Sequence, residues 1–297
     1  MQTTVNQSRE FPRYDPAARY EVATEDVEYR RAGDDVFLAR VYRPQGTGPF
    51  PALIDIHGGA WSMGDRLNDA PMDGALAASG VVVVAPDFRL APQHPYPASL
   101  ADVNYATRWL KAHAADFGAD PRHLGGLGSS SGGHQIVLSA MRPRDPRYAA
   151  LPLKEAPDAD ASVAYILACW PILDPYARCQ FAQETGRKEL VTRTEGFFLT
   201  EDAMKEGNPQ HILDRGEPVL LPAVLLLQGT ADTNLTVEMS ERFVACYRRA
   251  GGHAELEKFP DMPHGFGNQP GPEAERAVAL MKAFVARQLA SATNGQA

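Results

Sequence analysis

Three consecutive serines between glycines, the GSSSG run at residues 128–132, are the residues with the clearest potential for chemistry. Serine- and glycine-rich runs are usually linkers or turns. This run, however, follows an apolar stretch of strand length and leads directly into a helical pattern. That context fits the G-x-S-x-G nucleophile elbow, where the middle serine lies on a strained strand-to-helix turn and the glycines avoid steric collisions. Because Ser130 alone has glycine both two residues before and two after it, we predict that Ser130 is a nucleophile.

A serine hydroxyl needs a general base, which in serine hydrolases is a histidine. Three histidines follow the serine run beyond its own helix: His211, His253 and His264. His211 falls in a long segment between strands, and His253 falls in a turn where solvated histidines are common. His264, in the stretch DMPHGF, follows the last predicted strand on a loop bounded by proline and glycine. We therefore predict that His264 is the base.

The base in turn needs a carboxylate that orients it. Asp232 comes just past the end of the apolar run AVLLLQG, and sites in open α/β sheets form at the carboxyl ends of such strands. Asp174 and Asp261 are the alternatives, and both are more typical of turn or capping carboxylates. Where a nucleophile elbow is present, the chain order is serine, acid, histidine. Asp232 satisfies that order, and we predict that it is the acid.

Acyl transfer also requires hydrogen-bond donors for the developing oxyanion. The stretch HGGAW, residues 57–61, ends a predicted strand with glycines that allow backbone N–H groups to point into a cavity. Taken alone, this stretch is equally consistent with a plain strand-end turn. With an elbow downstream it predicts an oxyanion loop, in which the N–H groups of Gly59, Ala60 and Ser131 are the donors.

These residues need a sheet to position them, and strand and helix patterns alternate along the chain. An opening pair of strands is predicted at 27–31 and 35–44. Apolar runs typical of buried strands stand at 51–59, 80–89, 123–130, 161–170, 223–232 and 254–261. Helical patterns stand at 98–117, 131–141, 235–252 and 272–289. The alternation predicts an α/β fold with a mostly parallel central sheet and helices on both faces.

The 297 residues show no internal repeat and no clear linker, which predicts one domain over residues 1–297. The segment from about 174 to 216 is too long and too polar for a simple connection between two strands. Such excursions are usually functional insertions or lids. We therefore predict a helical cap formed by residues 174–216 and, at the other end of the chain, residues 1–25.

Composition and charge argue against several classes of partner. The net charge of −8 and the absence of a basic block argue against nucleic acid and anionic membrane surfaces. The longest apolar runs have strand length, so no membrane span is expected, and the polar N-terminal stretch lacks the apolar region of a signal peptide. Cys169, Cys179 and Cys246 lack CxxC spacing, which predicts buried, reduced thiols in a cytoplasmic protein. No His/Cys cluster has metal-ligand spacing, and no cofactor is expected.

Three stretches resemble the hormone-sensitive-lipase-like esterases of the α/β-hydrolase fold: HGGAW, PDFRLAPQHPYPASLAD and GSSSGGH. That family typically shows R-L-A-P-E-H-x-[FY]-P-A, which here occupies residues 89–98 with Gln93 in place of glutamate. The resemblance spans roughly residues 30–290. The chain departs from the family at the serines on either side of Ser130, where an acidic residue and alanine are usual. It also lacks a second carboxylate in the stretch after Asp232.

The resemblance implies a serine carboxylesterase that hydrolyses short- to medium-chain esters of small molecules through an acyl-enzyme, without metal or cofactor. It makes Trp61, Met63, Phe197 and Phe198 candidate walls of the substrate pocket, although such apolar residues more often belong to the core. The alternatives are an amide or formamide hydrolase similar to arylformamidase, a lyase or dehydratase, and a non-enzymatic ligand receptor. Receptors that resemble the family have lost the triad histidine, whereas His264 is present. Family members often form homodimers, and the sequence leaves the oligomeric state open.

Overall fold

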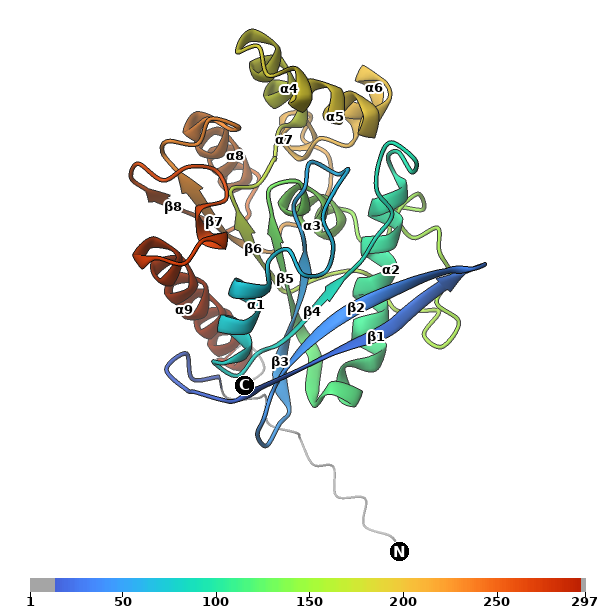
Figure 1. Cartoon of the computed structure of the whole chain (residues 1–297), viewed down its shortest axis with the longest axis vertical. Helices are drawn as coiled ribbons and strands as arrows, with labels where there is room; N and C mark the ends of the chain where they lie inside the picture. Colours follow the sequence, from blue (N-terminus) through green and yellow to red (C-terminus); the bar gives the residue numbers. More distant parts are fainter. Residues whose placement is uncertain (1–13, 295–297) are drawn as a thin grey trace, which may run out of the picture.

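The computed structural model describes residues 14–294, which are built around one eight-stranded sheet (Figure 1). The strands are β1 (Val22–Ala32), β2 (Asp35–Pro44), β3 (Phe50–Ile56), β4 (Val82–Pro86), β5 (Ala119–Ser129), β6 (Tyr165–Cys169), β7 (Ala223–Gly229) and β8 (Ala254–Phe259). Their order across the sheet is β1-β2-β4-β3-β5-β6-β7-β8. Strand β2 is antiparallel to both of its neighbours, and every pair from β4 to β8 is parallel. The predicted mostly parallel sheet is confirmed.

The helices are α1 (Ala70–Ala77), α2 (Ala98–His113), α3 (Ser131–Met141), α4 (Pro175–Glu184), α5 (Lys188–Phe198), α6 (Glu201–Glu206), α7 (Pro209–Asp214), α8 (Val237–Arg249) and α9 (Pro272–Asn294), with the short 3-10 helices η1 (Ala114–Phe117) and η2 (Phe266–Asn268). The four predicted helices correspond to α2, α3, α8 and α9. Helix α1 was not predicted, because Pro71 and Gly74 interrupt its short helical pattern. Proline is nevertheless tolerated there, since it stands in the first turn.

Successive side chains of the central strands enter two different cores. In β3, Ala52 and Ile54 pack into the core beneath α2, α3 and α8, whereas Leu53 packs into the core beneath α1 and α9. This alternation follows from the pleat of a strand, in which neighbouring side chains point to opposite faces. Because helices cover both faces, the strands are continuously apolar, as the sequence indicates.

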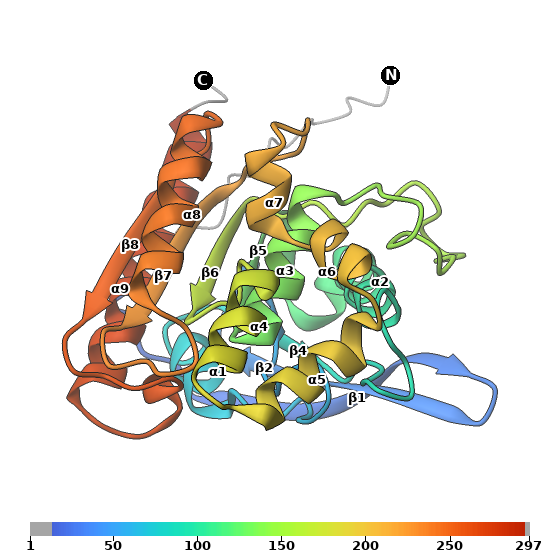
Figure 2. The same ribbon diagram turned by 90° about the horizontal axis from the view of Figure 1, so that it is seen from above.

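Helices α4, α5, α6 and α7 are grouped above α3 and the carboxyl ends of the central strands (Figures 1 and 2). They occupy the segment 174–216 for which a cap is predicted. The described part of residues 1–25 does not join these helices. It lies near the amino ends of the central strands, opposite the cap (Figure 1). There Tyr20 packs edge-on against Phe50 at the start of β3, with 5.3 Å between the ring centroids, and residues 22–25 belong to β1. Residues 1–13 lie outside the described residues.

Cys169, Cys179 and Cys246 are buried and form no disulfide, as predicted. Among the helices of residues 14–294, none combines the length and the apolar character that are needed to cross a lipid bilayer.

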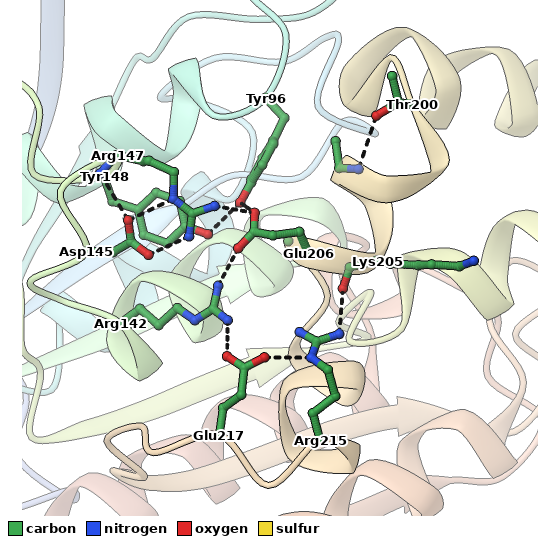
Figure 3. A network of polar contacts seen from close by, with 12 residues as sticks. Tyr96, Arg142, Asp145, Arg147, Tyr148, Thr200, Lys205, Glu206, Arg215 and Glu217 are labelled. Carbon is green, nitrogen blue, oxygen red and sulfur yellow. Dashed lines mark hydrogen bonds and ion pairs between the residues drawn. The ribbon is translucent and has the colours of Figure 1, made fainter.

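A polar network fastens the cap helices to the rest of the domain (Figure 3). Glu206, at the end of α6, accepts hydrogen bonds from Tyr96 at 2.5 Å and from Arg142 at 2.6 Å. It also pairs with Arg147 at 2.6 Å. Arg142, which directly follows α3, forms a second ion pair with Glu217. Glu206 therefore joins α6 both to the 89–98 stretch and to the segment after α3.

Glu206→Gln should loosen this attachment, because the amide keeps the size of the side chain but loses the charge that holds two guanidinium groups. We expect the loss of about 1 kcal/mol of stability, which lowers the Tm of a domain of this size by about 3 °C. Thermal denaturation followed by circular dichroism measures this shift. Glu189→Gln is the matched control, since the Glu189 side chain is 76% exposed and pairs with Arg193 in the next turn of α5. Equal shifts in the two variants would show that the network does not fasten the cap.

Candidate active site

The serine run forms a sharp turn between the end of β5 and the start of α3. Ser130 has φ 51° and ψ −115°, a left-handed conformation that residues other than glycine rarely adopt. The Ser130 N–H donates to the carbonyl of Cys169 at 2.9 Å, and the Ser130 carbonyl accepts from the N–H of Ile172 at 3.0 Å. These bonds hold the turn against the end of β6. The strained strand-to-helix turn has the form predicted for a nucleophile elbow.

Steric contacts explain the glycines on either side of this turn. A Cβ atom at Gly132 would lie 1.8 Å from the carbonyl oxygen of Ile56, and one at Gly128 would lie 2.7 Å from the carbonyl oxygen of Gly132. Both distances are too short for any side chain. The prediction that side chains at the flanking positions would collide is therefore confirmed. The contact with Ile56 also shows that the elbow presses against the end of β3, where the HGGAW stretch begins.

Ser130, His264 and Asp232 meet at the carboxyl ends of the strands. The hydroxyl of Ser130 lies 2.9 Å from Nε2 of His264, and Nδ1 of His264 lies 2.7 Å from Oδ2 of Asp232. The three residues come from the loops that follow β5, β8 and β7. The His264 side chain is 22% exposed and the Asp232 side chain is fully buried, so solvent reaches the imidazole and not the carboxylate.

The surroundings of Asp232 fix both its charge and its orientation. Its Oδ1 accepts from the N–H groups of Asn234 at 2.7 Å and Leu235 at 3.0 Å, and its Oδ2 also accepts from Gln228 at 2.9 Å. Burial by itself raises the pKa of Asp232, but the hydrogen bond and charge of His264 and the two backbone N–H groups outweigh it and hold the pKa below its ordinary value. The ionised carboxylate can only accept. His264 therefore donates from Nδ1, which leaves Nε2 to accept the Ser130 proton.

Within the described residues, the alternative acids and bases make no hydrogen bond with Ser130, His264 or Asp232. Asp174 caps the start of α4, and its Oδ1 lies 3.9 Å from Nε2 of His211. Asp261 is exposed and adopts a left-handed turn conformation with φ 58°. His253 is exposed and pairs with Glu255 at 3.0 Å.

The HGGAW stretch leaves β3 as a left-handed loop beside the elbow. Gly59, Ala60 and Trp61 have φ values of 119°, 49° and 59°. A Cβ atom at Gly59 would lie 2.0 Å from the carbonyl oxygen of Met63, so this position accepts glycine alone. The N–H of Trp61 donates to Oγ of Ser131 at 3.2 Å, which ties the loop to the start of α3.

The loop and the elbow leave three backbone N–H groups without an acceptor. Within residues 14–294, the N–H groups of Gly59, Ala60 and Ser131 donate no hydrogen bond. All three stand next to residues that are held by hydrogen bonds; Ser131 is buried, whereas Gly59 and Ala60 are partly exposed. These are the donors that the sequence predicts for an oxyanion hole. The loop and the elbow therefore leave the predicted donors available to a ligand oxygen.

A protein-family model also matches most of this chain. The BD-FAE family model matches residues 38–246, a span that includes the HGGAW loop, the elbow and Asp232. The chain belongs to the BD-FAE family. The predicted resemblance to α/β-hydrolases of the hormone-sensitive-lipase-like group is thereby confirmed at the level of the family.

Curated relatives of this BD-FAE family member include two proteins of Mycobacterium tuberculosis. The probable carboxylic ester hydrolase LipM is 30% identical over 255 residues, which cover 82% of this chain and 56% of LipM. Esterase LipC is 32% identical over 245 residues, which cover 79% of this chain and 58% of LipC. The chain therefore spans little more than half the length of these relatives.

Solved structures share the fold of this BD-FAE family member. Esterase B from Lactobacillus rhamnosis, in a structure with a C4-C4 tributyrin phosphonate, has a TM-score of 0.77 at 19% identity and covers 94% of this chain and 90% of its own. The butyrate-bound esterase Est2 from Thermogutta terrifontis has a TM-score of 0.71 at 24% identity, with 89% and 94% covered. At such low identity these matches show the fold alone. The fold is that of the α/β-hydrolases.

The aromatic residues predicted to line the pocket are packed together in this BD-FAE family member. Trp61 stacks on Phe197 with 5.0 Å between ring centroids and meets Phe198 edge-on at 5.6 Å. The exposed fractions of the three residues are 1%, 0% and 2%, whereas Met63 is 49% exposed. The three aromatic residues thus form a buried contact between the HGGAW loop and α5, which fits their alternative interpretation as core residues. Contact of any of the four with a substrate stays a prediction.

Two further residues support this site, and neither belongs to the motifs that the sequence shows. Gln228 donates to Asp232, and its signal was a polar residue at the end of an otherwise apolar strand. His134, on α3, accepts from the indole N–H of Trp61 at 3.1 Å and donates to the carbonyl of Gly207 at 2.8 Å. Burial lowers the pKa of His134 to about 4, so the ring is neutral and links the loop to the cap.

Proposed function

We propose that this member of the BD-FAE family is a serine carboxylesterase that hydrolyses short- to medium-chain esters of small molecules. The observation that carries the proposal is the unbroken hydrogen-bonded path from Ser130 through His264 to Asp232. Its order and geometry are those in which histidine can remove the serine proton while a carboxylate stabilises the resulting imidazolium. The relatives LipM and LipC, which are named as ester hydrolases, support the same reaction.

Acylation begins when Oγ of Ser130 attacks the carbonyl carbon of the ester. Nε2 of His264 takes the hydroxyl proton, and Asp232 holds the Nδ1–H of the imidazolium. Negative charge develops on the carbonyl oxygen, and the free N–H groups of the loop and elbow donate to it. His264 then protonates the departing alcohol, and the acyl group stays on Ser130.

Deacylation reverses these roles with water as the nucleophile. His264 removes a proton from the water, which attacks the carbonyl carbon of the acyl-enzyme. The same oxyanion forms and is held by the same donors. Collapse of the intermediate releases the carboxylic acid and returns the proton from His264 to Ser130. In this proposal no metal ion or organic cofactor takes part in either step.

A panel of matched substrates tests the reaction class. We expect kcat/KM for a butyrate aryl ester to exceed that for the matching anilide by about 100-fold or more, because an amide carbonyl is less electrophilic than an ester carbonyl and an anilide nitrogen is a poorer leaving group than an aryl oxide. Within an ester series, activity should be highest among acetate, butyrate and octanoate and should fall at palmitate. A preference for the anilide or for an aryl formamide would identify an amide or formamide hydrolase. Binding of the substrates without any turnover would instead indicate a receptor.

We also propose a cytoplasmic location, which the three free and buried cysteines support. The net charge of −8 supports small molecules over nucleic acid as partners. Formation of a homodimer stays a prediction.

A further inference from the structure

Asp69 lies beneath the elbow at the start of α1, where it is 1% exposed. Its Oδ2 accepts a hydrogen bond from the Ser129 hydroxyl at 2.7 Å, and its Oδ1 accepts one from the Asn268 amide at 3.0 Å. Ser129 directly precedes Ser130. Asn268 belongs to η2, the short helix that follows His264. The carboxylate is thus bonded to the segments that carry the predicted nucleophile and the predicted base.

Ser129 extends this contact to the HGGAW loop. A carboxylate can only accept hydrogen bonds, so the Ser129 hydroxyl donates its proton to Asp69 and turns its lone pairs toward other donors. The N–H of Gly58 lies 3.0 Å away and donates to it. Gly58 directly precedes Gly59, one of the predicted oxyanion donors. Through one hydroxyl, Asp69 therefore also orients the loop that carries these donors.

The Asp69 side chain does not serve the helix that it begins. Aspartate at the N-cap of a helix ordinarily accepts from the first free N–H groups of that helix. Here the side chain makes no such bond, and the Asp69 carbonyl accepts from the N–H of Met72 at 2.9 Å instead. The carboxylate points away from α1 toward Ser129 and Asn268. Its contacts are those of the site and not those of a helix cap.

Asp69 is one of three buried aspartates, and within residues 14–294 it alone among them accepts hydrogen bonds from side chains. No side chain within residues 14–294 donates a hydrogen bond to the other two, Asp55 and Asp73, and burial raises the pKa of each well above its ordinary value. Burial also raises the pKa of Asp69, to about 6, while its bonds from Ser129 and Asn268 act in the opposite direction. Among the three carboxyl groups, the hydrogen bonds from Ser129 and Asn268 therefore favour the ionised form of Asp69.

We propose that Asp69 is a positioning residue for the reaction, which fixes the oxyanion loop, the elbow and the His264 loop relative to one another through Ser129 and Asn268. The inference rests on the proposed function. Asp69 acts on no substrate atom itself. Its contribution is to hold donors and base within the narrow tolerance of catalysis, where a displacement of about 1 Å costs about 100-fold in rate.

Asp69→Ala should lower kcat per active site by about 100-fold and leave KM within about threefold. The inhibition constant of a trifluoromethyl ketone, which places an oxyanion in the hole, should rise by a similar factor. Active sites are counted by titration with a phosphonate, so that unfolded protein does not lower the apparent kcat. A purely structural role would lower Tm and the number of titrated sites, and would leave kcat per site unchanged.

Single removals of the two partners keep the test valid if Asp69→Ala fails to fold. Ser129→Ala and Asn268→Ala each remove one hydrogen bond to Asp69 and should each lower kcat by about tenfold. The double variant Asp69→Ala/Ser129→Ala should lose no more than Asp69→Ala alone, because both residues act along one path. Asp73→Asn is the matched control, since Asp73 is buried on the same helix but contacts neither Ser129 nor Asn268 through a hydrogen bond. We expect its kcat within about twofold of wild type.

Two results would overturn the inference. One is kcat per titrated site within about twofold of wild type in every one of the three single variants. The other is a double variant whose loss equals the product of the two single losses, which would mean that Asp69 and Ser129 act independently. Wild-type protein that neither hydrolyses esters nor takes up the phosphonate would instead refute the proposed function, and the inference with it. Ester hydrolysis and phosphonate uptake by the wild-type protein therefore distinguish failure of the inference from failure of the proposed function.

Discussion

Ser130→Ala is expected to lower kcat for ester hydrolysis by about a million-fold, as loss of the nucleophile does in a serine protease. The substitution removes the one atom that forms the acyl bond, and the histidine and the oxyanion donors remain without a reaction to assist. The protein should stay folded, because Oγ of Ser130 contributes a hydrogen bond to His264 and little else to stability. Initial rates with a butyrate aryl ester measure the loss, and circular dichroism confirms the fold.

Ser131→Ala is the control for the register of the elbow. Its backbone N–H is unaffected, and the side chain loses one hydrogen bond from the N–H of Trp61 at 3.2 Å. We expect its kcat to fall by no more than about tenfold. If Ser131→Ala were the inactive variant and Ser130→Ala remained active, the assignment of the nucleophile would be wrong by one position.

Asp232→Asn is expected to lower kcat by about four orders of magnitude at pH 8, the cost of this change in a serine protease. The structure gives a reason specific to this site. Because Oδ1 accepts from two backbone N–H groups, the amide oxygen of asparagine must occupy that position. The NH₂ group then faces Nδ1 of His264 and donates to it. This favours the tautomer with its proton on Nε2, which cannot accept from Ser130.

Asp174→Asn and Asp261→Asn are the matched comparisons for this prediction. Asp174 caps α4 and forms an ion pair with Arg242, so its loss should lower stability more than activity. Asp261 is exposed, and its loss should change little. All three variants are assayed after each has been shown to be folded. If Asp261→Asn were the variant with the large loss of kcat, the assignment of Asp232 as the acid would be wrong. The assignments of Ser130 and His264 would be unaffected.

The central elements of this site could be predicted because each has a local signal or follows from sheet geometry. The elbow is encoded within five residues, 128–132, by contacts that exclude side chains from two of them. Asp232 and His264 could be inferred because the carboxyl ends of parallel strands meet at one edge of the sheet. Asp69 had no such signal. Its two partners are 60 and 199 residues away in the chain, and no pattern around Asp69 indicates them.

The sequence indicates which segment of the chain forms the cap, but not which helices the cap contains. Helices α4 to α7 are short, and α6 and α7 have six residues each, so the helical pattern has little length over which to appear. The packing of Trp61 against Phe197 could not be predicted from the sequence either. Apolar side chains near a predicted site can line a pocket or fill a core, and the stacking of Trp61 on Phe197 depends on how α5 folds back over the HGGAW loop.

Covalent labelling tests most directly whether Ser130 is the nucleophile of a serine esterase. Wild-type protein is treated with diethyl p-nitrophenyl phosphate, and residual esterase activity is compared with the site of modification by peptide mass spectrometry. We predict one adduct per chain, located on Ser130 and formed in proportion to the loss of activity, and no adduct on the folded Ser130→Ala variant. Inactivation with the adduct on another residue, or full esterase activity in protein that takes up no label, would contradict this prediction.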